Sequence, residues 1–223
     1  MLIPKMSFTH LSKTHKKAVI LSSLCLLTVI CSGLALDQTT KHLSEKNLMT
    51  WSSPDNLRSY TGSLYRIVEW GNHKTARTTG PYFAFNLSYV RNPGAAWGSF
   101  SNLPDHIRIP FFNIITILCI IVILGFLIKT PYSHRTSRLA HTLIFTGALG
   151  NMSDRFRLNY VIDWIDVRWN VAGWYYAFPN FNVADICITF GATLFITDAL
   201  ILESLRRRKL AKQTVDTTQV SAN

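Results

Sequence analysis

Two long apolar stretches constrain this chain more than any other feature of its sequence. Residues 109–128 contain no charged side chain, and residues 183–202 contain only Asp185 and Asp198. An α-helix rises about 1.5 Å per residue, so a stretch of this length crosses a hydrocarbon core about 30 Å thick. We therefore predict a membrane-spanning helix over each range.

Two further stretches extend the prediction to four spans. Residues 18–36 are apolar apart from Ser, Thr and Gly, whereas residues 138–156 carry a shorter apolar segment that ends in polar side chains. A segment of that length on its own is more typical of a buried or re-entrant helix. Gly147, Ala148 and Gly150 give it a surface of small residues, which predicts close packing against neighbouring helices. Taken over 138–156, it reaches spanning length.

The distribution of charge orients these spans. The net charge of +11 comes from 23 Lys and Arg against 12 Asp and Glu in 223 residues. Basic residues gather before the first span, between the second and third, and after the fourth. Cytoplasmic segments are enriched in such residues, so both termini are predicted to be cytoplasmic. This orientation explains the charge without a nucleic-acid partner, since the bases do not interleave with aromatic residues on one face.

The predicted fold is an all-α integral membrane protein with four transmembrane helices and a small extracytoplasmic β-rich cradle. Residues 1–17 form a basic cytoplasmic N-terminus, residues 37–108 the outer cradle and residues 206–223 a basic cytoplasmic tail. A cleaved signal peptide ending near Ala35 is an alternative for the first span. Its removal would leave three spans and break the charge pattern, so we favour a retained anchor. We expect a monomer surrounded by membrane lipid.

Four polar clusters lie in or beside the spans, where ionisable groups are costly. Asp37 and Lys41 are four residues apart and can pair on one helix face, although a solvated ion pair at a helix end is an equal alternative. Residues 92–97 form either an ordinary turn or a site edge. The other clusters are Gly147, Asn151 and Arg155 on one helix face, and Asn182 with Asp185 at a helix start.

Four acidic residues between the end of the third span and the start of the fourth are predicted to meet at the outer membrane face, because the third span runs outward and the fourth returns. They are Asp154, Asp163, Asp166 and Asp185. Two carboxyl groups held close together cannot both ionise, so one keeps its proton. Such a pair can activate a water molecule and protonate a leaving amine, as in aspartic proteases. Spacing alone leaves open which acid partners Asp185.

Five blocks of the sequence resemble the lipoprotein signal peptidases (signal peptidase II) of bacteria. They are DQTTK (37–41), NPGAAW (92–97), GALGNMSDR (147–155), VIDWI (161–165) and FPNFNVAD (178–185). Each block is weak alone, but the five occur in the order of that family on a four-span frame with both termini inside. The resemblance covers residues 18 to about 205.

The resemblance implies an intramembrane aspartyl endopeptidase that needs no cofactor or metal. Its substrates would be diacylglyceryl-modified prolipoproteins, cleaved before the lipidated cysteine, at the periplasmic face of the bacterial inner membrane. It implies that Asp163 and Asp185 are catalytic, and it leaves Asp166 outside the pattern. Supporting positions are Asp37, Lys41 and Asp154. Positions that match the substrate and inhibitor pocket are Asn92, Gly94, Asn151, Arg155 and Asn182.

The segment before NPGAAW departs from the family pattern, because it carries polar additions at about residues 50–80. The addition is predicted to decorate the outer cradle, where Trp97 would help to clamp the signal peptide. A non-enzymatic transporter or assembly factor is the competing function, with the carboxyl groups as a proton or ion site. A proton relay would place acids at several depths, whereas here only Asp198 lies apart from the outer group.

Overall fold

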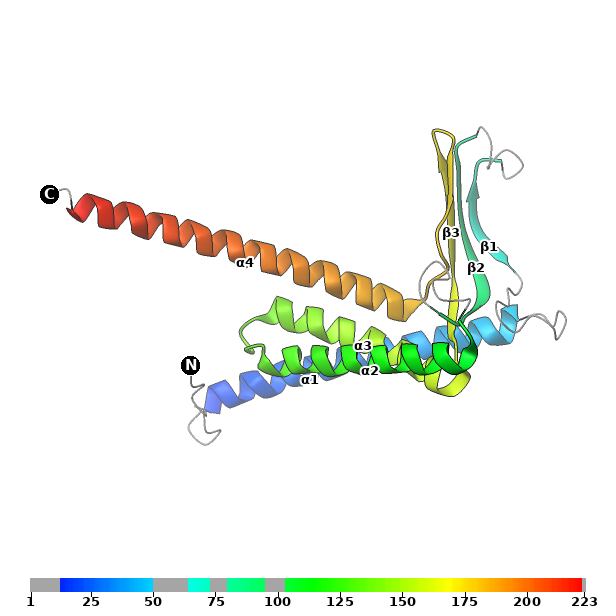
Figure 1. Ribbon diagram of the computed structural model, residues 1–223, viewed down its shortest axis with the longest axis horizontal. Helices are drawn as coiled ribbons and strands as arrows, with labels where there is room; N and C mark the ends of the chain where they lie inside the picture. The colour runs from blue at the N-terminus through cyan, green and yellow to red at the C-terminus, as the bar shows by residue number, and fades with distance from the viewer. Residues whose placement is uncertain (1–12, 50–63, 73–79, 95–102, 222–223) are drawn as a thin grey trace.

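The computed structural model describes residues 13–49, 64–72, 80–94 and 103–221, and within them the chain forms four helices and a four-stranded sheet (Figure 1). The helices are α1 (Lys13–Leu48), α2 (Asp105–Lys129), α3 (Arg135–Leu158) and α4 (Val183–Ser221). The strands are β1 (Tyr65–Trp70), β2 (Tyr82–Asn92), β3 (Val161–Val171) and β4 (Trp174–Ala177). The sheet lies at one end of the helices, and α1 begins and α4 ends at the other (Figure 1).

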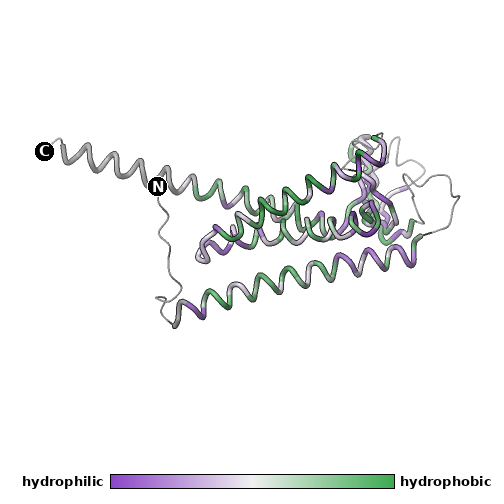
Figure 2. Tube along the Cα trace, turned by 60° about the horizontal axis from the view of Figure 1, so that its bottom comes forward, coloured by the Kyte–Doolittle hydropathy of each residue, from purple (hydrophilic) through white to green (hydrophobic). Residues whose placement is uncertain are grey.

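Three of the described helices are long and apolar enough to cross a membrane. The segments are Lys16–Leu48 in α1, Asp105–Lys129 in α2 and Val183–Leu202 in α4. Large apolar side chains such as Leu21, Ile121 and Leu200 are exposed on them, as a helix surrounded by lipid requires. Figure 2 shows the hydrophobic middle of α1, the helix that follows the N-terminal trace, between more hydrophilic ends.

Helix α3 is not among those three, and its surroundings explain its composition. It contacts each of the other three helices and buries polar side chains such as Thr142 and Thr146. The prediction of close packing is confirmed, because a Cβ atom on Gly147 would lie 2.2 Å from the Ala184 carbonyl oxygen. A helix shielded from lipid in this way needs little apolar surface. A membrane span over α3 stays a prediction.

The sheet is antiparallel with the strand order β1-β2-β3-β4. Its register shifts by one residue between Leu87 and Val90 of β2, opposite an uninterrupted β3. The predicted cradle, residues 37–108, does not coincide with the sheet. Helix α1 continues through residues 37–48, and half of the strands come from the segment that follows α3.

Two other predicted segments differ from the structure or lie partly outside it. The tail predicted at 206–223 is a continuation of α4 as far as Ser221. Within the addition at about 50–80, strand β1 is described, and residues 50–63 and 73–79 lie outside the described residues. Trp97 also lies outside them.

Candidate active site

A polar centre lies where α1, α3, the start of β3 and the start of α4 meet. Asn182 caps α4 and is fully buried. Its side-chain Oδ1 accepts a hydrogen bond from the Asp185 backbone N–H at 3.0 Å, and the Asp185 Oδ2 accepts one from the Asn182 backbone N–H at 3.2 Å. This reciprocal capping box fixes the Asp185 carboxyl group in the first turn of the helix.

The same asparagine bridges two acidic side chains. Its Nδ2 donates to the Oδ1 of Asp163 at 2.7 Å, so one residue is hydrogen-bonded to Asp163 and to Asp185. The Asn151 Nδ2 donates to the second oxygen of Asp185 at 2.8 Å. The Asn92 Nδ2 donates to the second oxygen of Asp163, also at 2.8 Å. Three asparagines therefore position the two carboxyl groups that the family resemblance implies are catalytic.

The environment of Asp163 changes its titration. Burial and, to a smaller extent, the nearby negative charge of Asp185 together raise the pKa of its carboxyl group to about 7. Hydrogen bonds from Asn92 and Asn182 oppose this shift because they favour the ionised form. A carboxyl group with such a pKa can hold or release a proton near neutral pH.

A second cluster lies behind this pair and is centred on Lys41. The Lys41 Nζ lies 2.9 Å from the Asp37 carboxylate and 2.9 Å from the Asp154 carboxylate. It also donates to the Asn151 Oδ1 at 3.0 Å. All three charged side chains are buried, so the alternative of a solvated pair at a helix end was wrong.

The two acids of this cluster also hold the ends of the elements that carry the catalytic candidates. The Asp37 Oδ1 accepts a hydrogen bond from the Ala184 N–H at the start of α4, at 2.9 Å. The Asp154 Oδ2 accepts one from the Ile162 N–H at the start of β3, at 3.2 Å. The cluster therefore ties α1 and α3 to α4 and β3 and acts on the site by position.

Sequence reasoning missed one member of this cluster, Gln38. Its Nε2 donates to Asp37 and to Asp154, each at 3.1 Å, and its Oε1 accepts from Arg157 at 3.0 Å. The residue lies inside the DQTTK block, which was the available signal. Its partner Asp154 is distant in sequence, so the contact itself could not be derived from spacing.

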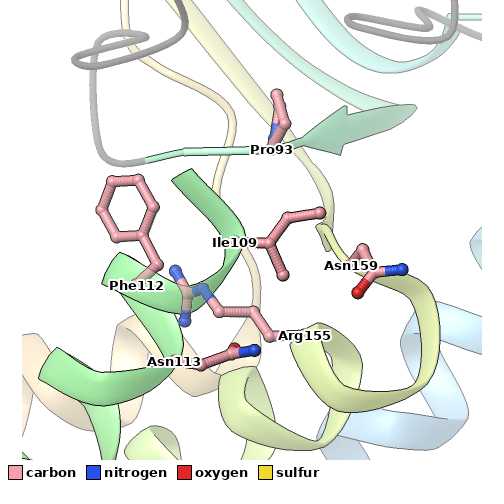
Figure 3. Close-up of a pocket in the computed structure, with 6 residues that line it drawn as sticks. All are labelled: Pro93, Ile109, Phe112, Asn113, Arg155 and Asn159. Atoms are coloured by element: carbon pink, nitrogen blue, oxygen red, sulfur yellow. The ribbon is translucent and has the colours of Figure 1, made fainter. Parts of the chain in front are cut away.

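Beside the pair, a small cavity opens between α2 and α3 (Figure 3). It is lined by Pro93, Ile109, Phe112, Asn113, Arg155 and Asn159. Arg155 extends from α3 toward α2, and its guanidinium lies 5.8 Å from the centre of the Phe112 ring. Pro93 follows Asn92, and the Gly94 N–H donates to the Asn92 Oδ1 at 3.1 Å. The cavity therefore adjoins the end of β2, where the Asn92 side chain hydrogen-bonds to Asp163.

Asp166 belongs to a different set of contacts. It pairs with Arg168 at 2.5 Å and accepts a hydrogen bond from Asn86 at 3.3 Å. Within the described part of the chain, no three His, Cys, Asp or Glu side chains are grouped so that they could hold a metal ion.

Comparison with known proteins gives the family. A family model described as signal peptidase (SPase) II matches residues 29–201. The chain belongs to the signal peptidase II family. Over 151 residues it is 44% identical to a lipoprotein signal peptidase of Pasteurella multocida, with 67% of this chain and 86% of the relative covered. Over 180 residues it is 41% identical to one of Geobacter sulfurreducens, with 80% and 92% covered.

Solved structures agree with this membership. Two structures described as bacterial membrane enzymes match at 30% identity with TM-scores of 0.58 and 0.56. They cover 81% and 79% of this chain and 89% and 92% of their own. The chain is therefore a membrane-embedded peptidase of the signal peptidase II family, and the competing transporter or assembly function is not favoured. The resemblance identified from the five sequence blocks is confirmed.

Proposed function

We propose that the chain is an intramembrane aspartyl endopeptidase that removes signal peptides from diacylglyceryl-modified prolipoproteins. In this proposal, cleavage occurs before the lipidated cysteine, and Asp163 and Asp185 are the catalytic pair. The observation that carries it is the bridge of Asn182, which is hydrogen-bonded to both carboxyl groups at the start of α4. The family model and the curated relatives support the peptidase class and the lipoprotein substrates.

The two carboxyl groups are proposed to carry different charges at rest. Asp163 has a pKa of about 7, because burial and the nearby Asp185 charge disfavour its ionised form. Asp185 lies in the first turn of α4, where it accepts hydrogen bonds from the Asn182 backbone N–H and from the Asn151 side chain. Asp163 therefore holds the shared proton near neutral pH, and Asp185 is the base.

The reaction follows from this difference. Asp185 accepts a proton from a water molecule, whose oxygen attacks the scissile carbonyl carbon, while the Asp163 carboxyl donates its hydrogen to the carbonyl oxygen. The carbon–nitrogen bond then breaks as the proton on Asp185 passes to the amine of the lipidated cysteine. Asp163 regains a proton from the hydroxyl group of the collapsing intermediate, so the pair returns to its starting state.

The cavity beside the pair is the proposed entry point of the substrate. Pro93, which lies between Asn92 and Gly94, forms one edge, and the Arg155 guanidinium offers hydrogen-bond donors to carbonyl oxygens of the bound segment. The diacylglyceryl chains would lie along the apolar surfaces of the helices, where each buried CH₂ contributes about 0.8 kcal/mol. Asn182 is fully buried, so its proposed part in substrate binding is to position the two acids.

Four membrane spans with both termini in the cytoplasm are the proposed topology. Helix α3 reaches about 36 Å at 1.5 Å per residue, which is enough to cross the bilayer. Its contacts with α1, α2 and α4 support a central position out of contact with lipid. This topology places the catalytic pair and the sheet at the outer face of the inner membrane.

The test replaces each acid singly with asparagine and measures cleavage of a lipidated precursor by the purified enzyme in nanodiscs. Asp163→Asn and Asp185→Asn should each lose more than about 100-fold in rate, as expected when a general acid or base is removed. Asp166→Asn is the matched control, since Asp166 lies on the same strand but contacts Arg168 and Asn86.

Full activity in either Asp163→Asn or Asp185→Asn would refute the assignment of these two residues as the catalytic pair. Asp154→Asn extends the test, because Asp154 contacts Lys41 and the start of β3 and no atom of the pair. If Asp154→Asn abolishes cleavage while the protein stays folded, the choice between Asp154 and Asp163 is open again.

A further inference from the structure

The four-stranded sheet has two chemically different faces. Residues directly opposite one another on neighbouring strands share a face. Trp70 pairs with Phe83, Phe83 with Trp169, and Trp169 with Tyr176. A row of aromatic side chains therefore crosses all four strands on one side, and we name this side the aromatic face.

The rest of this face is also apolar. Val68, Phe85 and Val167 form the next row of cross-strand partners. Val171 and Trp174 pair where β3 turns into β4, and Trp174 is 81% exposed. No charged residue occurs in these described pairs. An exposed apolar surface of this kind marks a site of contact with a membrane or another protein.

The opposite face carries the charged and amide side chains, beside the buried Tyr82 and Ala84. Glu69 pairs with Ala84 and Ala84 with Arg168, while Asn86 pairs with Asp166. Asn86 and Arg168 both donate hydrogen bonds to Asp166. A sheet with one solvated side normally turns its polar face to water and its apolar face to a core. Here the apolar face is the exposed one, and its contact with water would be unfavourable.

The direction of the aromatic face follows from β3. Side chains alternate along a strand, so Asp163 lies on the same side of β3 as Val167 and Trp169. The Asp163 carboxyl group bonds to Asn182 at the start of α4, where a helix able to span the membrane begins. The strands also run across the direction of the helices and reach past them (Figure 1). The aromatic face therefore points in the direction in which the helices extend away from the sheet.

We propose that the aromatic face lies against the outer lipid surface of the membrane that the helices span. Ring contacts of Trp169 with Phe178 and of Phe178 with Phe181 extend it to the start of α4, a helix whose large apolar side chains are exposed. Trp and Tyr are enriched at the boundary between headgroups and acyl chains, because they combine an apolar ring with a polar group. This contact fixes the height of β3, and with it Asp163, above the bilayer.

The test places a fluorescent probe on either side of strand β1. In a variant with all four cysteines replaced by alanine, Val68→Cys puts the probe on the aromatic face and Arg66→Cys puts it on the polar face. The two side chains are similarly exposed, at 49% for Val68 and 41% for Arg66. The labelled proteins are reconstituted into nanodiscs of phosphatidylcholine brominated at the upper part of its acyl chains.

The emission maximum of the probe at Val68 should shift to shorter wavelength, and the brominated lipid should quench most of its fluorescence. The probe at Arg66 should keep its fluorescence. Val171→Cys repeats the measurement at the far end of the aromatic face if the Val68 variant does not fold. Equal quenching at both positions, or none at either, overturns the proposal. A shielded probe at Val68 that depends on protein concentration and not on brominated lipid also overturns it, because a second copy would then cover the face. No outcome depends on the catalytic assignment.

Discussion

Replacing Lys41 with methionine removes the one cation at the centre of a buried cluster. The Lys41 Nζ lies 2.9 Å from each of two carboxylates, those of Asp37 and Asp154, and donates to Asn151 at 3.0 Å. Methionine has a similar length and no charge, so it fills the space of the side chain without pairing either acid. Two buried carboxyl groups then face one another with no cation between them.

The size of the effect follows from this burial. Removing one partner of a buried ion pair costs about 3–5 kcal/mol, because the remaining charge is left uncompensated. The exposed pair of Arg66 and Glu69, with 2.5 Å between nitrogen and oxygen, provides the control. A surface pair contributes about 0–1 kcal/mol, so Arg66→Met should have little effect. For a chain of this size, Lys41→Met should lower the melting temperature by about 6–20 °C.

The assay is thermal unfolding of purified protein in detergent, measured at pH 7. A triple variant that adds Asp37→Asn and Asp154→Asn should recover much of the stability at pH 7. The reasoning is refuted if Lys41→Met is no less stable than Arg66→Met, since the cluster would then be solvated.

Three further predictions follow, two on the proton of Asp163 and one on the packing of α3. The proposed mechanism requires a protonated Asp163, whose pKa is about 7, so kcat/KM should fall about tenfold per pH unit above pH 7. A flat alkaline profile would contradict the assignment. The pKa of Asp163 in the folded state lies above the ordinary 3.8. Between pH 3.8 and about 7 the carboxyl group ionises more readily in the unfolded state, so the folded state loses stability as pH rises. Asp163→Asn should therefore unfold at a higher temperature than wild type at pH 8 but not at pH 4. Gly147→Ala should destabilise the fold by about 1–3 kcal/mol, since its Cβ would meet the Ala184 carbonyl oxygen at 2.2 Å. Gly125→Ala in α2 is the control, because its Cβ would have no atom within 4 Å, and equal melting temperatures for the two alanine variants would count against the close packing.

The helices were the most predictable part of the fold. The uncharged run at 109–128 lies within α2, and the run that begins at 183 coincides with the start of α4. The end of α1 was misplaced, because residues after Leu36 are polar and resemble a loop in isolation. They stay helical because Asp37 and Lys41 are buried against α3, a contact that local sequence does not contain.

The sequence predicted which residues belong to the candidate site but not how they are arranged in space. Spacing placed Asn182 and Asp185 on one helix turn, and the capping box between them confirms that proximity. The bridge from Asn182 to Asp163 joins α4 to a strand that the predicted cradle omitted. The aromatic face was also missed, because it depends on which residues of four strands stand opposite one another.

The one-residue shift in β2 has a consequence for the proton at the site. Beyond the shift, Val90 stands opposite Asp163 and Asn92 reaches the Asp163 carboxyl group. Without the extra residue, alternation would bring Arg91 to that side of the strand in place of Asn92. A guanidinium there would stabilise the negative charge of Asp163 and strip away its proton at neutral pH. A single inserted residue in a neighbouring strand thus selects a neutral amide over a cation, and so decides whether this carboxyl group can serve as an acid.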